Sequence, residues 1–184
     1  MRVSRAAKAE SRDRIVAAAA RRLRAAGVEG SSVGDMMADA GMTHGGFYRH
    51  FANKDALVAA AIAAAFAEFS EPLAAGVAAG EAPAAAADFV ARYLGDGHVA
   101  HPELGCPVPA TAADIARSGD AARAAFGAGA TAVVDALAAA LTGPRRRERA
   151  WRQFAMLAGA VLIARASDPA TAAEVLATAR RGSL

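Results

Sequence analysis

Residues 41–57, GMTHGGFYRHFANKDAL, form the most informative segment of this chain. Phe47 and Phe51 are four positions apart, so a short helix ending near Phe51 places both rings on one face. Asn53 is a good N-cap for the next helix, which is predicted from Lys54 to about Ser70 and should end at the following proline. The stretch therefore predicts a short helix followed by a long one.

Two more helices are predicted upstream of this stretch. The first has apolar periodicity over residues 11–26 and ends at Gly27, a residue suited to a helix C-terminus. The second covers residues 33–40 and begins after Ser31 or Ser32 as its N-cap. A long helix followed by two short ones joined at a glycine is the layout of a helix-turn-helix DNA-binding unit.

The composition favours an all-α protein. Of the 184 residues, 57 are alanine and only 5% are aromatic. Alanine has the highest intrinsic helix propensity, whereas β proteins depend on β-branched and aromatic residues. An α/β nucleotide-binding enzyme is therefore not expected.

The charge is unevenly distributed. The net charge is +3, but Met1 to Leu57 holds ten basic and six acidic residues, a balance of +4. The remainder holds eleven basic and twelve acidic residues, a balance of −1. A basic arm ahead of a neutral body is typical of a protein that contacts a polyanion, although a solvated arginine-rich tail gives the same count.

The segment from Arg12 to Leu57 resembles the DNA-binding domain of the TetR/AcrR family of bacterial transcriptional regulators. The resemblance is carried by residues 41–57, quoted above, and upstream by the pairs Gly27-Val28 and Ser32-Val33. Val28 stands where the family has an aromatic residue, and Ser32 where it has threonine. These departures are conservative, and the resemblance covers about the first third of the chain.

The resemblance implies an all-α chain of about nine helices in two domains. Residues 1–57 would form the basic arm and a three-helix DNA-binding domain, with a connecting helix over about 54–70. Residues 72–184 would form a helical domain for effector binding and dimerisation. The implied function is a cytoplasmic, non-enzymatic repressor: a homodimer that binds a palindromic double-stranded operator and is released by a small-molecule effector.

Nine residues are the candidate DNA contacts. Thr43 would present a hydroxyl and free backbone N–H groups to phosphate or a base edge. Gly45 and Gly46 are poor helix formers, but their small size permits close approach to the major groove. Base discrimination is assigned to Thr43, His44 and Gly45. The full set is Ser31, Ser32, Thr43, His44, Gly45, Gly46, Tyr48, His50 and Lys54.

The body of the chain is less informative. Residues 73–83 suggest a linker with a short helix, and residues 95–109 suggest a loop. Helices are predicted over 84–94, 111–118, 120–141, 144–167 and 169–181. The last two carry an apolar stripe with small residues, which in the TetR family packs against a second subunit as a four-helix bundle. Packing of this stripe within the monomer is the alternative.

The effector pocket is expected among the bulky side chains of the second domain. Few polar groups are available there to orient a ligand, so a small apolar or aromatic effector is favoured. The candidates are Phe66, Phe69, Phe89, Tyr93, Cys106, Phe126, Trp151, Phe154 and Met156.

Cys106 has two interpretations. As the single cysteine it is either a small buried apolar residue or an electrophile or redox sensor activated by nearby histidine or arginine. The segment Leu104–Pro107 resembles that of a TetR subgroup in which some members respond to electrophiles. His98, His101 and Cys106 lie close in sequence, but their spacing matches no zinc motif, so no metal is expected. No cofactor motif is present.

Two other function classes stay open. One is a helical small-molecule binding protein or enzyme without a DNA role, although no catalytic triad, phosphate loop or paired carboxylate site is visible. The other is a DNA-binding protein whose second domain only dimerises. No stretch suggests a secretory signal or a membrane span, and the basic run Arg145–Arg149 is interpreted as a solvated helix face.

Overall fold

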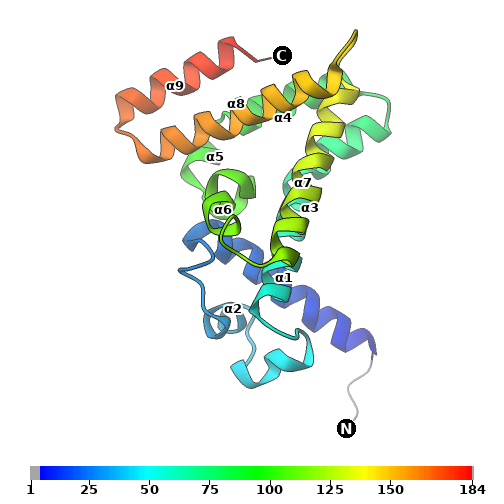
Figure 1. Ribbon diagram of the computed structural model, residues 1–184, viewed down its shortest axis with the longest axis vertical. Coiled ribbons are helices and arrows are strands. Elements are labelled where there is room, and N and C mark those ends of the chain that lie inside the picture. The colour runs from blue at the N-terminus through cyan, green and yellow to red at the C-terminus, as the bar shows by residue number, and fades with distance from the viewer. Residues whose placement is uncertain (1–4, 184) are drawn as a thin grey trace.

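The computed structural model describes residues 5–183, and over these residues the chain contains nine α-helices, two 3-10 helices and no strand. The all-α prediction is confirmed. Figure 1 shows the N-terminal helices at one end, α3 and α7 rising from them, and α8 with α9 across the opposite end. Arg2 and its neighbours at the start of the predicted basic arm lie outside the described residues.

Three helices form the N-terminal unit. Helix α1 is Arg5–Ala26, α2 is Val33–Asp39, and the 3-10 helix η1 is His44–Arg49. Their shared core contains Ile15, Leu23 and Phe47, all of which are at most 1% exposed. This trio confirms the predicted helix-turn-helix layout.

Local sequence signals place the boundaries of these helices. Ser32 caps α2, with the Asp35 backbone N–H donating to its hydroxyl and the Asp35 carboxylate accepting from the Ser32 N–H, a complete capping box. Asn53 caps α3 through the Ala56 N–H. Gly27, at φ +73°, adopts the left-handed conformation that follows α1, as its position predicted.

Helix α1 begins earlier and α3 ends later than predicted. The first helix starts at Arg5 rather than near Ser11, because the alanine-rich sequence before Ser11 sustains helix. Helix α3 covers Lys54–Ala78 and passes through Pro72, where a helix end was predicted. The flanking Phe69 and Leu73 are buried, and their packing outweighs the hydrogen bond that the proline lacks.

The predicted loop over 95–109 is also wrong, because this segment is mostly helical. It contains α5 (Asp96–Ala100), the 3-10 helix η2 (Pro102–Leu104) and the start of α6 (Pro107–Ile115). The prolines stand in the first turn of η2 and α6, where no backbone N–H is needed. Gly and Pro therefore mark helix starts here rather than an irregular loop.

The remaining helices agree with prediction within a few residues. They are α4 (Ala82–Tyr93), α7 (Asp120–Ala139), α8 (Arg146–Ala166) and α9 (Pro169–Arg181). Pro144 was expected as the first residue of α8, but the helix begins after Arg145, which adopts a left-handed conformation at φ 54°. Asp168 caps α9 through the N–H groups of residues 170 and 171.

Helices α3 and α7 pack along each other through the centre of the molecule. Among the described residues, these two are long and apolar enough to cross a membrane by length and composition. Core helices of globular proteins meet the same criteria, and α3 and α7 both contribute buried apolar side chains to one continuous core. The pairing matters for function because α3 begins beside η1 and carries Glu68 and Phe69 near its middle.

Candidate functional site

The segment from Thr43 to Arg49, here called the recognition segment, presents most of its side chains to solvent. Tyr48 is 74% exposed although Phe47 beside it is buried, so the ring of Tyr48 points away from the core. Thr43 and His44 are exposed, and Thr43 precedes η1 without using its hydroxyl as a cap. These groups are free to contact a partner.

The two glycines of the recognition segment differ in their surroundings. A Cβ added to Gly45 would meet no atom within 4 Å, so nothing in the protein requires glycine there. A Cβ on Gly46 would lie in ordinary contact with Met37 Cε at 3.7 Å. The absence of a side chain at Gly45 opens space on the outer surface, as close approach of another molecule demands.

Basic residues surround a concave surface next to the recognition segment. The concavity has a volume of about 530 Å³ and joins α1 to η1. Its lining residues are Lys8, Ser11, Met42, Tyr48, Arg49 and His50. Lys8, Ser11 and Arg49 were not among the predicted contacts. The signal that could have found Lys8 and Ser11 is their helical spacing, which places them together on one side of α1.

His50 is less open than its neighbours. Its Nδ1 atom is buried and has no hydrogen-bond partner among the described residues. Burial lowers the pKa of His50, and the positive charges of Lys8, Arg12 and Arg49 lower it further. The imidazole is therefore neutral at neutral pH, and it lies in a positive field that favours an anion nearby.

Three of the nine predicted contacts are already engaged inside the protein. Ser31 is fully buried, and its hydroxyl donates to the Gly27 carbonyl at 2.6 Å. Lys54 is half-buried, and its Nζ donates to the Val28 carbonyl at 3.0 Å. Ser32 is exposed, but its hydroxyl serves the capping box of α2. For Ser31 and Lys54 these bonds supply a structural role that was not anticipated.

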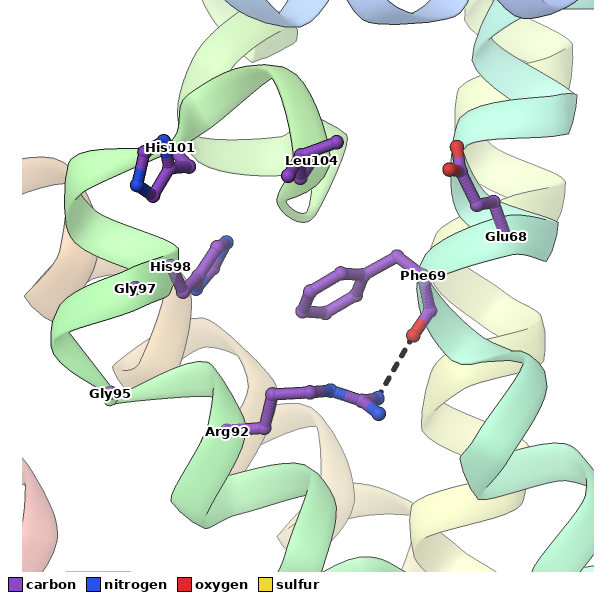
Figure 2. Close-up of a pocket in the computed structure, with 8 residues that line it drawn as sticks. All are labelled: Glu68, Phe69, Arg92, Gly95, Gly97, His98, His101 and Leu104. Carbon is purple, nitrogen blue, oxygen red and sulfur yellow. Dashed lines mark hydrogen bonds between the residues drawn. The ribbon is translucent and has the colours of Figure 1, made fainter.

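A cavity of about 570 Å³ lies in the second domain between α3, α4 and the α5–η2 segment. Figure 2 shows the Phe69 ring pointing across it toward His98, with the Arg92 guanidinium beneath the ring and Leu104 above. The lining residues are Glu68, Phe69, Arg92, Gly95, Gly97, His98, His101 and Leu104.

Only Phe69 of the nine predicted pocket residues lines this cavity. Phe66 and Phe126 pack on each other, as do Phe89 and Tyr93, and these rings form the core around it. Trp151 is 40% exposed on the outer side of α8. The wall instead uses charged residues and glycines, which a search for bulky apolar side chains does not detect.

Cys106 is buried in the wall behind the cavity. Its side chain has no exposure, and burial raises the pKa of the thiol to about 11. The Cys106 backbone N–H donates to His98 Nε2 at 2.9 Å, and the other ring nitrogen, Nδ1, contacts the Tyr93 carbonyl at 2.6 Å. These contacts assign the proton to Nδ1, and they fit the interpretation of Cys106 as a small core residue.

Arg24 of α1 connects the N-terminal unit to the edge of this cavity. Its side chain is completely buried, and Nη2 donates to Glu68 Oε2 at 2.7 Å. Nη1 donates to the Gly105 carbonyl at 3.0 Å, directly after Leu104. A second connection joins the Val28 N–H to Asp114 Oδ2 of α6 at 2.7 Å. The first helix and the cavity thus share a network of short hydrogen bonds.

The comparisons with known proteins agree with this architecture. Residues 15–61 match the family described as "Bacterial regulatory proteins, tetR family". No match was found among curated protein sequences.

Several solved structures share the fold over nearly the whole chain. The reduced form of NemR from E. coli is 19% identical with a TM-score of 0.77, covering 94% of this chain and 96% of NemR. A TetR-family regulator from Cytophaga hutchinsonii is 22% identical with a TM-score of 0.77, covering 98% and 96%. The multidrug binding protein EbrR, complexed with imidazole, is 26% identical with a TM-score of 0.62, covering 92% and 93%.

The matched segment contains the helix-turn-helix trio from Ile15 onward, and the remaining helices follow the same fold as these regulators. Residues 15–61 thus form a DNA-binding domain of the tetR family of bacterial regulatory proteins, and the chain is a DNA-binding transcriptional regulator with the fold of the regulators in that family.

Proposed function

We propose that this regulator is a homodimeric repressor that acts in the cytoplasm and leaves a palindromic operator when a small effector enters its second domain. The proposal has three parts: the DNA contacts, the dimer and the release mechanism. Each is supported by different residues, so each can fail separately.

The recognition segment would enter the major groove. Thr43, His44 and Gly45 are exposed and stand where base edges would be met, while Tyr48 and His50 flank them toward the phosphates. We add Lys8 and Arg49 as phosphate contacts, because they line the adjoining concave surface. Gly46 and Ser32 would lie within reach of the DNA sugar-phosphate backbone, whereas Ser31 and Lys54 would mainly stabilise the fold of the protein.

The second copy would pack on α8 and α9. Part of the stripe predicted on α8 packs inside the monomer, where Phe154, Ala158 and Val161 are buried. A second apolar stripe follows another side of α8 at the spacing of a helix face, and none of its residues is buried. Its members are Trp151, Ala155, Gly159, Leu162 and Ala166. Leu162 is 53% exposed, and exposure of large apolar side chains beside small ones suits close helix packing. A two-fold dimer would present two recognition segments to one face of DNA.

The observation that carries the release mechanism is the buried Arg24. It is part of α1 in the DNA-binding unit, yet it bonds Glu68 and Gly105 at the cavity. An effector that displaces Glu68 or Leu104 would therefore shift α1 and change the separation of the two recognition segments. For release, the effector must bind the DNA-incompetent arrangement better than the competent one, and DNA affinity then falls by the same factor.

The apolar Phe69 and Leu104 in the cavity wall support an aromatic effector, and ligand binding by the similar protein EbrR is consistent with it. No observation favours sensing through Cys106, whose raised pKa keeps it as a thiol at neutral pH.

The test begins with duplexes selected from a random pool by the full chain. Compounds from an aromatic panel that raise the melting temperature are then titrated into the protein–DNA complex and followed by fluorescence anisotropy. Leu104→Trp fills the cavity, so compounds that no longer bind to this variant are cavity ligands. We expect these compounds to release the duplex from the unmodified protein. The release mechanism is wrong when such compounds bind in the cavity and leave DNA affinity unchanged.

A further inference from the structure

The charged residues of the cavity wall are not equivalent. Four of its eight lining residues carry ionisable side chains: Glu68, Arg92, His98 and His101. A ligand can be recognised only by a group that is not already satisfied by the protein. The partners of each group therefore decide what chemistry the cavity accepts.

Glu68 is matched by a cation. The Arg24 guanidinium lies 2.7 Å from its carboxylate and is itself completely buried, so this cation cannot move away into solvent. The negative charge of Glu68 is thus compensated within the protein. A cationic ligand would have to compete with Arg24, which the Gly105 and Ala20 carbonyls also hold.

The two histidines offer little to a charged ligand. Both ring nitrogens of His98 are used, by the Cys106 N–H and by the Tyr93 carbonyl, and burial lowers its pKa to about 4. His98 is therefore neutral at neutral pH and has no donor left for the cavity. His101 is exposed and pairs with Glu103, with 3.3 Å between Nδ1 and Oε1.

Arg92 is different. Among the described residues no carboxylate pairs with it, and its single hydrogen bond there runs from Nη2 to the Phe69 carbonyl at 3.0 Å. The guanidinium also lies over the Phe69 and Phe89 rings, at 5.3 Å and 5.8 Å from their centroids. These contacts fix the plane of the guanidinium and leave the other N–H donors for a partner. A fixed arginine with free donors matches a carboxylate in geometry and charge.

We propose that the cavity takes an aromatic carboxylate, whose anionic group pairs with Arg92 and whose ring packs on Phe69 and Leu104. The inference rests on the proposed function, because it names the chemical class of the effector for that same site. It refines the expectation of an apolar or aromatic effector by adding one negative charge. The cavity volume of about 570 Å³ is sufficient for a ligand with two fused rings.

The test uses three probes of one shape and different charge: 2-naphthoate, 2-naphthamide and 2-naphthylmethylamine. Binding to the full chain is measured by isothermal titration calorimetry at pH 7.5 and low salt. We expect naphthoate to bind about tenfold or more tighter than the amide, since a hydrogen bond to a charged group contributes roughly 1.5–3 kcal/mol. The amine should bind most weakly.

Two variants locate the charge preference. Arg92→Gln should remove the advantage of the acid over the amide. The matched control Arg123→Gln changes an exposed arginine of α7, away from the cavity lining, and should leave the preference intact. Circular dichroism melting confirms that both variants are folded. A preference for the amide or the amine, equal binding of all three, no binding of naphthoate, or a preference that survives in Arg92→Gln would overturn the inference.

The proposed ligand class and the proposed release mechanism can be refuted separately. A neutral or cationic compound that releases DNA, and whose binding Leu104→Trp abolishes, would refute the ligand class and keep the release mechanism. Naphthoate that binds through Arg92 without any effect on DNA affinity would keep the ligand class and refute the release mechanism.

Discussion

The recognition segment and the cavity use their polar side chains in opposite ways. In the recognition segment Tyr48 is largely exposed and Gly45 has no neighbour, so what the protein offers is free surface. In the cavity, Glu68 and His98 are engaged within the protein, and Arg92 alone of the cavity's charged lining keeps most of its donors. The properties of the recognition segment follow from residues that are neighbours in the sequence. Those of the cavity follow from contacts between residues that are far apart in the sequence.

The largest expected effect is at Gly45. Gly45→Phe should lower DNA affinity at least about a hundredfold, because a bulky ring would stand between the recognition segment and the groove, a loss of about 2.7 kcal/mol or more. Stability should hardly change, since no atom of the protein lies within 4 Å of the added Cβ. Anisotropy titration and thermal melting measure the two quantities.

Gly127→Phe is the matched control for this substitution. Gly127 is also exposed with no atom within 4 Å of an added Cβ, but it lies on α7. An equal loss of DNA affinity in both variants would mean that the recognition segment is not the DNA-contacting surface.

The second prediction concerns the cavity side, at Cys106. Its thiol pKa is raised from 9.0 to about 11, so at pH values well below 9 the folded protein holds about a hundredfold less thiolate than the unfolded chain. Alkylation by iodoacetamide at pH 7.5 should be at least about a hundredfold slower in the native protein than in urea, and faster as the pH rises toward 11. Mass spectrometry of quenched samples gives both rates. Similar alkylation rates in the native and the urea-unfolded protein would contradict a buried thiol and favour the interpretation of Cys106 as a sensor.

Features that depend on neighbouring residues could be predicted from the sequence alone. Ser32 and Asn53 cap their helices as predicted, because capping depends on a residue and its next three neighbours. The exposed residues from Thr43 to Tyr48 were predicted for the same reason. The helical pattern around Phe47 decides which side chains turn outward.

Tertiary contacts explain what sequence could not predict. Helix α3 continues through Pro72 because Phe69 and Leu73 are buried against other helices. Arg24 looks like one more basic residue of the arm, yet its partners Glu68 and Gly105 are 44 and 81 positions away. No periodicity in a single sequence connects such positions. For the same reason the cavity wall was predicted among bulky residues, most of which, such as Phe66, Phe89 and Tyr93, prove to be core.

The third prediction links the two regions. Arg24→Met keeps the length of the side chain but removes its bonds to Glu68 and Gly105. A cavity ligand lowers DNA affinity by some factor in the unmodified protein. In Arg24→Met this factor should be about 5- to 150-fold smaller, which corresponds to the loss of a typical coupling free energy. DNA affinity without ligand should change less. The measurement is anisotropy at saturating ligand.

Glu68→Gln separates coupling from general damage. Its side chain is 56% exposed, so the neutral variant should fold while losing only the ion pair with Arg24. Intact release in both variants would show that this network does not connect the cavity to α1.

The smallest effect distinguishes two basic residues near the DNA. Arg49→Gln should weaken binding to every duplex several-fold and reduce the slope of log K against log salt by about 0.9, the value for one lost phosphate contact. Lys54→Gln should alter the slope less, because its Nζ already bonds the Val28 carbonyl. Titrations between 50 and 200 mM salt, roughly the range in which such slopes are measured, compare the two. A larger change of slope in Lys54→Gln than in Arg49→Gln would show that Lys54 contacts phosphate.

Selection of duplexes from a random pool shows whether a dimer binds DNA through its recognition segments. We expect enriched sites with two-fold symmetry, half-sites whose centres lie about 10 base pairs or a multiple apart, and two protein copies bound per site. We also expect that Gly45→Phe enriches nothing while Gly127→Phe enriches the same sites. Enriched sequences without symmetry, or the same enrichment with Gly45→Phe, would contradict a dimer that binds DNA through its recognition segments.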